Sequence, residues 1–184
     1  MSKAVLISIK PEWCDLILRG KKTIEVRKTI PKQLKLPFKV YIYCTKAKKG
    51  WLNLLTGEQL DGKVIGEFTC DRIYKYSSDY NGCRPVDGTD ITTTEMVRQS
   101  CLSAVKLYNY EYSAEPKENC LYMVGLYGWH ISNLVIYDKP KLLIDFKQCH
   151  KCPYYANCID SDLSCDGTFR LNNPPQSWCY VEEL

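Results

Sequence analysis

The stretch GKKTIEVRK, Gly20–Lys28, combines a turn glycine, four cationic side chains and one carboxylate with only two aliphatic residues. Successive side chains of a β-strand point to opposite faces of its sheet. Ile24 and Val26 therefore predict a short strand with one buried face. The opposite face carries the polar residues: Thr23, Glu25 and Arg27.

This polar face has two interpretations. In the first it is a solvated edge, where an exposed Glu25–Arg27 pair contributes less than about 1 kcal/mol. In the second it lines a cleft, in which Glu25 and Arg27 hold each other in place. Lys22, leaving the turn, then projects its ammonium toward an anionic or carbonyl-bearing ligand. The residues alone leave both interpretations open.

The segments before this stretch predict a strand followed by a helix. Ala4–Ile9 is a short β-branched run typical of a buried strand. Pro11 suits the first turn of a helix, because backbone N–H groups in that turn have no acceptor within the helix, so the N–H that proline lacks is not needed there. Apolar residues at helical spacing then continue to Gly20, which is a helix stop signal.

The remaining chain predicts more strands than helices. Strands are expected at 39–44, 63–70, 121–129, 133–137, 141–146 and in the closing SWCYVEEL. One further helix is expected at 92–105, with Thr92 and Glu95 at capping-box spacing. Its apolar stripe would consist of Val97, Cys101, Ala104 and Val105. Short strands without regular strand–helix alternation predict an α+β fold, a mixed β-barrel with short covering helices.

The length and composition of the chain limit the classes of protein to which it can belong. A chain of 184 residues with 45% apolar and 25% charged residues supports one domain, or one domain with a small appendage. The net charge of +4 is mild, but lysines are dense at 21–48, which permits a phosphate-bearing partner. No stretch has the length of a secretory or membrane-spanning segment, so we expect a cytoplasmic protein with no membrane partner.

A basic loop adds candidate ligand contacts. Lys46 lies near Trp51 in the sequence, and an exposed Trp beside lysines is suited to stacking on an unpaired base. The alternative is that the lysines are simply solvated and that Trp51 fills the core. Lys10, which follows the first strand, is a further candidate contact.

The sequence also resembles a known family. SIKPEWCDLILRGKKTIEVRK resembles the opening of the activating-signal-cointegrator homology (ASCH) domain, a PUA-like fold marked by a helix followed by G-x-K-x-x-E-x-R. Gly20, Lys22, Glu25 and Arg27 fit that pattern. The segments GWHIS, IYDKP and PPQSWCYVEEL are similar to a phage and bacterial branch of the family.

The resemblance implies a barrel whose cleft binds RNA or a nucleoside or nucleotide. Some similar proteins are amidohydrolases that act on acetylated cytidine through a lysine, a threonine three residues further on and a distant glutamate. Lys22 matches that lysine, whereas Glu25 replaces the threonine. The alternative to binding is therefore a hydrolase acting on a modified nucleoside or on RNA, with Glu25 as general base and Lys22 stabilising an oxyanion.

A cluster of cysteines predicts a metal site. The chain has 11 cysteines, and an odd number in a reducing compartment argues against a disulfide framework. Cys149 and Cys152 have C-x2-C spacing, and Cys158 and Cys165 complete a set of four thiolates. Zinc suits this set, and an iron–sulfur cluster is the alternative. The predicted organisation is a barrel at 1–146, a Cys-rich clip at 147–170 and a closing strand of the barrel at 171–184.

Overall fold

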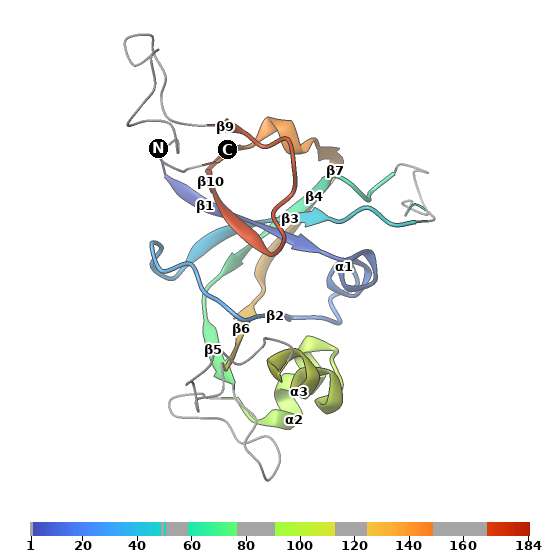
Figure 1. Cartoon of the computed structure of the whole chain (residues 1–184), viewed down its shortest axis with the longest axis vertical. Helices are drawn as coiled ribbons and strands as arrows, with labels where there is room; N and C mark the ends of the chain where they lie inside the picture. The colour runs from blue at the N-terminus through green and yellow to red at the C-terminus, as the bar shows by residue number, and fades with distance from the viewer. Residues whose placement is uncertain (1, 49, 51–58, 77–90, 113–124, 149–168) are drawn as a thin grey trace. The chain divides into compact units, whose positions relative to one another are not determined.

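The structure is a computed structural model that describes residues 2–48, 50, 59–76, 91–112, 125–148 and 169–184 (Figure 1). The chain divides into two compact units. Unit 1 comprises Met1–Cys14, Phe38–Phe68 and Leu134–Leu184, and unit 2 comprises Asp15–Pro37 and Thr69–Asn133. No helix in the described part of the chain is both long and apolar enough to cross a membrane.

Unit 1 is built on a seven-stranded sheet with the order β7-β4-β3-β1-β10-β8-β9. Its strands are β1 Lys3–Ile9, β3 Phe38–Cys44, β4 Val64–Cys70, β7 Ser132–Lys141, β8 Lys147–Gln148, β9 Phe169–Arg170 and β10 Trp178–Glu182. β1 pairs in parallel with β3 and antiparallel with β10. The predicted first strand and the predicted return of the C-terminal segment as a strand are both confirmed.

The apolar run of β1 explains its central position. Six of the seven residues of β1 are buried, which is the pattern of a strand covered on both faces. Leu6 packs in a cluster with Tyr41 of β3 and Val181 of β10. The Phe146 ring meets Tyr41 edge to face, with ring centroids 5.0 Å apart. This cluster is the core of unit 1.

The predicted barrel is not found. In the described part of the chain, the order of the seven-stranded sheet runs from β7 to β9, and no closed barrel forms. The predicted strand at 141–146 is also wrong, because Leu143–Asp145 is a 3₁₀ helix and β7 already extends to Lys141. β7 contains Pro140 and lies at an end of the sheet, where a residue without an N–H removes no ladder bond.

Unit 2 combines a three-stranded antiparallel sheet, in the order β2-β6-β5, with two helices. The strands are β2 Ile24–Arg27, β5 Ile73–Tyr76 and β6 Leu126–His130, and the helices are α2 Thr93–Ser100 and α3 Ala104–Tyr112. Figure 1 shows α2 and α3 beside one face of this sheet. Ile24 and Val26 of β2 pack with Met96 of α2 and Leu107 of α3 in the core of the unit.

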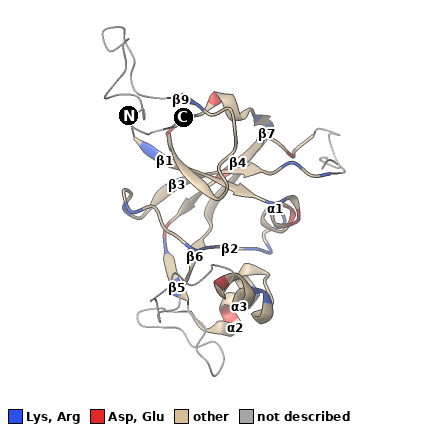
Figure 2. Cartoon of the chain, in the orientation of Figure 1, with Lys and Arg blue, Asp and Glu red and all other residues tan. Residues whose placement is uncertain are grey.

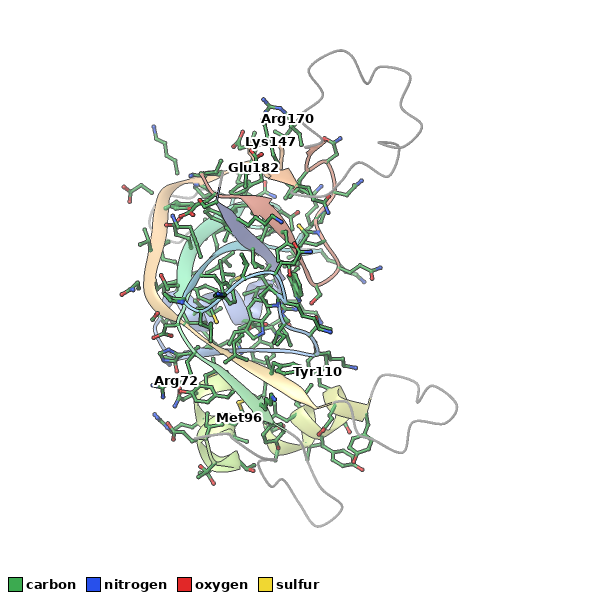
Figure 3. The ribbon with its side chains drawn as sticks, turned by 90° about the vertical axis from the view of Figure 1, so that its left-hand side faces the viewer. Arg72, Met96, Tyr110, Lys147, Arg170 and Glu182 are labelled. Atoms are coloured by element: carbon green, nitrogen blue, oxygen red, sulfur yellow. The ribbon has the colours of Figure 1, made fainter. Side chains whose placement is uncertain are left out.

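A glycine in the central strand allows this packing to be tight. A Cβ added to Gly128 of β6 would lie 2.8 Å from Met96 Cε and 2.9 Å from Ile24 Cγ2. Both distances are shorter than real Cβ contacts, so only glycine leaves room for Met96 against the strand. Figure 3 shows Met96 among the helices of this unit.

The predicted helix at 92–105 is two helices. Cys101 is in the left-handed conformation with φ 57° and ends α2. α3 begins at Ala104, and the Ser103 hydroxyl accepts a bond from Lys106 N at 3.2 Å. The predicted cap is confirmed, since Thr92 Oγ1 accepts a hydrogen bond from Glu95 N at 3.2 Å. The predicted apolar stripe fails beyond the break, where Val105 is 67% exposed.

The helix expected after Pro11 is confirmed as α1, Pro11–Leu18. Gly20 follows it with φ +66°, a conformation that glycine adopts without steric cost. Within unit 2, the amides of Lys21 and Lys22 both donate to Leu16 O, at 2.9 and 3.0 Å. This turn fixes the start of the segment that leads into β2.

Candidate ligand-binding site

Three charged side chains predicted from the sequence lie together in unit 2. Lys22 Nζ is 3.3 Å from Glu25 Oε2, and Arg27 Nη2 is 3.1 Å from Glu25 Oε1. We call these residues the charge cluster: Lys22, Glu25 and Arg27. They are 2%, 6% and 9% exposed, respectively. The solvated-edge interpretation of this segment is therefore wrong.

The burial of all four residues of β2 has a simple cause. β2 pairs with β6 on one edge, with Glu25 opposite Trp129 and Arg27 opposite Tyr127. Its aliphatic side chains enter the core of unit 2. The face that carries Glu25 and Arg27 is buried as well. The alternation of apolar and polar residues therefore identifies the two faces of β2 but does not show which of them is exposed.

The charge cluster is held by backbone as well as by side chains. Lys22 Nζ donates a hydrogen bond to the carbonyl oxygen of Ser100, the last residue of α2, at 2.7 Å. Thr23 Oγ1 donates to Gln99 Oε1 at 3.1 Å, and Thr23 N donates to Gln99 O at 2.9 Å. The C-terminal end of α2, where helix carbonyls lack helical partners, thus fixes the ammonium.

The charge balance of the cluster is unusual for a buried region. Two cations face one carboxylate, and removing charges from water costs several kcal/mol for each ion unless pairing compensates. Glu25 Oε2 is buried and accepts no hydrogen bond from the described residues. Its ion-pair partner Lys22 lies nearby but outside hydrogen-bond geometry. A carboxylate oxygen in this position has unused accepting capacity.

Tyr110 of α3 joins the cluster and was missed by sequence reasoning. It is hydrogen-bonded with Arg27, and Lys28 Nζ lies 5.0 Å from the centre of its ring. Burial raises the pKa of the Tyr110 hydroxyl, although the positive charge of Arg27 opposes that rise. Figure 3 shows Tyr110 beside the helices of unit 2. A tyrosine on a helix distant in sequence gives no local signal, so only the fold reveals it.

Two of the other predicted contacts are described by the structure, and both are residues of unit 1. Lys10 and Lys46 are exposed residues of unit 1, and Lys46 packs over Gly62, whose added Cβ would lie 3.2 Å from Lys46 Cγ. Trp51 lies outside the described residues. Figure 2 shows Lys and Arg distributed along both units rather than concentrated on one element.

The predicted metal ligands also lie outside the described residues: Cys149, Cys152, Cys158 and Cys165. Within the described ranges, no three His, Cys, Asp or Glu residues are grouped as metal ligands would be. The strands that flank the cysteines are described. β8 and β9 pair antiparallel, with Lys147 opposite Arg170 and Gln148 opposite Phe169.

Comparison with known proteins identifies the fold. No protein-family model and no curated protein matches the sequence. The structure is similar to the crystal structure of ASCH from Zymomonas mobilis, with a TM-score of 0.56 and 19% identity over 98% of this chain and 88% of that chain. A mutant form of the same protein gives a TM-score of 0.54 and 21% identity over 99% and 92% of the two chains. The resemblance to the ASCH domain is therefore confirmed at the level of the fold: this chain has the ASCH-domain fold, although its described residues form no closed barrel.

Proposed function

We propose that this protein binds RNA, or a nucleoside or nucleotide, and recognises a base through the charge cluster. The observation that carries the proposal is the burial of two cations and one carboxylate on a short strand and the turn that leads into it. Apolar residues of similar volume would stabilise such a position equally well or better. A ligand gives a reason for charged residues to be kept there.

The chemistry of the cluster suits the edge of an unpaired base. Arg27 and Lys22 donate hydrogen bonds, and Glu25 accepts them, so the cluster offers both kinds of partner that a base edge requires. A carboxylate in particular accepts from an exocyclic amino group such as that of cytosine. Buried polar groups reject ligands that leave them unpaired, which would give the site selectivity.

Binding of a labelled single-stranded RNA, followed by fluorescence polarisation, tests the proposal. We expect affinity to fall as salt concentration rises, since phosphate contacts release counterions. Lys22→Met should weaken binding by at least about tenfold, the loss expected for a charge-assisted hydrogen bond. Lys48→Ala, which removes an exposed lysine of unit 1, is the matched control. Equal affinities for the two variants would refute the proposal.

A hydrolase acting on a modified nucleoside is the second candidate, and the free accepting capacity of Glu25 Oε2 favours it. In acetylated cytidine, water attacks the acetyl carbonyl carbon while Glu25 takes its proton. Lys22 stabilises the oxyanion, the C–N bond breaks, and the proton passes to the departing amine. Chromatography of the products distinguishes this reaction from binding. Release of acetate and cytidine by wild type but not by Glu25→Gln would establish it, and an unchanged substrate would exclude it.

We also propose that Cys149, Cys152, Cys158 and Cys165 bind one structural zinc ion. The pairing of β8 with β9 supports this, because it brings together the two ends of the segment that contains all four cysteines. Closing such a segment reduces the entropy lost when its thiolates gather around a metal.

Elemental analysis of the purified protein tests the metal proposal. About one zinc per chain, lost in Cys152→Ser and retained in Cys101→Ser, is the expected result. Iron with visible absorbance would instead identify an iron–sulfur cluster. Absence of both metals after purification without chelators would contradict the proposal.

A further inference from the structure

The segment that follows β2, residues 28–37 of unit 2, carries cations and no carboxylate. Asp and Glu are absent from the whole stretch 26–57 of the sequence. Lys32 and Lys35 of this segment are exposed. Figure 2 shows the segment, which leads from β2 to β3, with basic and no acidic residues. A local excess of one sign of charge attracts ligands of the opposite sign.

The local structure of this segment presents its lysines to solvent. Leu34 N donates to Pro31 O at 3.2 Å, which closes a turn with Lys32 and Gln33 at its tip. Pro31 is buried and Leu34 is half-buried, whereas Lys32, Gln33 and Lys35 are exposed. Apolar residues therefore anchor the segment, and the lysines between and beside them point away from the anchored side.

An exposed lysine also precedes β2. Lys21 is exposed, and its amide donates to Leu16 O in the turn that includes Gly20. β2 has four residues and spans about 10 Å, at a rise of about 3.3 Å per residue. Exposed cations thus lie before and after the short strand at which the charge cluster is built. We call three of them the flanking lysines: Lys21, Lys32 and Lys35.

The flanking lysines differ from other exposed cations of unit 2 in having no carboxylate partner. Within the described residues, none of the three forms a salt bridge. By contrast, the exposed Arg19 is paired with Asp15, and the exposed Arg98 is paired with Glu95. An anionic ligand at the flanking lysines would therefore not have to displace a carboxylate of the described chain.

The order of the charges along this part of the chain selects the class of partner. A purely anionic polymer would meet the flanking lysines but would be repelled by the Glu25 carboxylate that lies between them in the chain. A base offers an amino group to that carboxylate, while the phosphates beside the base offer anions to lysines. Membrane surfaces are bound by amphipathic helices, and residues 28–37 contain no helix. Single-stranded nucleic acid, which alternates bases with phosphates, matches both kinds of contact.

We infer that single-stranded nucleic acid runs along β2, with one base at the charge cluster and the phosphates on either side of it bound by the flanking lysines. The inference rests on the proposed function and names the partner of that site as a polynucleotide. A free nucleoside would reach the charge cluster alone, whereas an oligonucleotide would also reach the lysines on both sides of β2.

The salt dependence of binding counts the phosphate contacts. For single strands, the slope of log K against log salt concentration is about −0.7 for each phosphate neutralised. With a short labelled oligocytidylate, Lys32→Gln/Lys35→Gln should make the slope shallower by about 1.4, and Lys21→Gln by about 0.7. Lys75→Gln/Lys139→Gln is the matched control and should keep the wild-type slope, because it removes two exposed lysines of β5 and β7. Cytidine, which has no phosphate, should bind wild type and all three variants equally well.

The outcomes separate the inference from the proposed function. If the variants of the flanking lysines keep the wild-type slope, or if the control lowers it as much, the inference is wrong. Cytidine binding that is lost in Lys22→Met would then still support the proposed function. If cytidine binding is the same in wild type, Lys22→Met and Glu25→Gln while the flanking lysines still set the slope, the proposed function is wrong. The flanking lysines would then bind phosphates without a base at the charge cluster.

Inorganic polyphosphate tests the class of partner directly, because it offers phosphates without bases. We expect oligocytidylate to bind wild type more tightly than polyphosphate of the same charge, and this preference should disappear in Glu25→Gln. Equal affinities of wild type for the two polymers would overturn the inference by showing that the flanking lysines bind any polyanion.

Discussion

β1 and β2 are both buried strands, yet they bury opposite kinds of side chain. β1 places an apolar run in the core of unit 1, between β3 with seven residues and β10 with five. β2 has only four residues, all of them buried, and Glu25 and Arg27 are among them. Apolar burial accounts for β1 without any ligand. The same principle does not account for β2, and this difference is the basis of the functional proposal.

The largest effect that we expect comes from removing the shared partner of the two cations. Glu25→Ala removes the buried carboxylate that pairs with both Lys22 and Arg27 and should lower the free energy of unfolding by about 3–5 kcal/mol. Urea denaturation measures this loss. A change below about 1 kcal/mol, the size of an exposed pair, would show that the cluster is solvated in solution and would remove the contrast with β1.

A matched deletion in β1 tests the other half of the comparison. Leu6→Ala removes a fully buried side chain from the core of unit 1 and should lower the free energy of unfolding by about 2–5 kcal/mol. RNA binding by the folded fraction should remain that of wild type. Loss of binding in a folded Leu6→Ala protein would mean that β1 also serves the site.

The partner strand of β2 offers a smaller effect. Gly128→Ala forces Met96 and Ile24 away from the new methyl group and should cost about 1–3 kcal/mol. Combining it with Met96→Ala should cost less than the sum of the two single changes, because the smaller side chain removes the closest clash. Strict additivity of the two costs in urea denaturation would contradict the packing described for β6.

The smallest effect concerns the helix whose end holds Lys22. Thr92→Ala removes the cap of α2 and should lower the free energy of unfolding by about 1 kcal/mol. Thr94→Ala, within the same helix and exposed, is the control and should be neutral or slightly stabilising. Equal melting temperatures for the two variants would refute the capping role.

The sequence predicted the elements that depend on local signals. α1 follows from Pro11 and Gly20, β1 from a continuous apolar run, and the cap of α2 from the Thr92–Glu95 spacing. The break at Cys101 was not predicted, because a left-handed residue other than glycine has no clear sequence signature. The short strand β5 was also missed, since its pairing with β6 joins segments far apart in the chain.

The candidate site was predicted only in its local part. Lys22, Glu25 and Arg27 lie within six residues of one another, so period-two alternation and the family motif indicate them together. Their burial was left open, because it depends on how the polar face of β2 is covered. The Ser100 carbonyl and Tyr110 come from distant helices, and a backbone oxygen leaves no trace in residue identity. The burial of the charge cluster and its contacts with the two helices could therefore be found only from the tertiary structure.

The most direct test replaces the whole charge cluster by apolar residues. We expect Lys22→Met/Glu25→Leu/Arg27→Met to stay folded, with a free energy of unfolding equal to that of wild type or higher, because all three charges of the cluster are removed together and none of them is left without its partner in the cluster. In a fluorescence polarisation titration with single-stranded RNA, this folded variant should lose the base-dependent part of its affinity. If it binds the same RNA as tightly and as selectively as wild type, the charges of the cluster are structural and the proposed function is wrong.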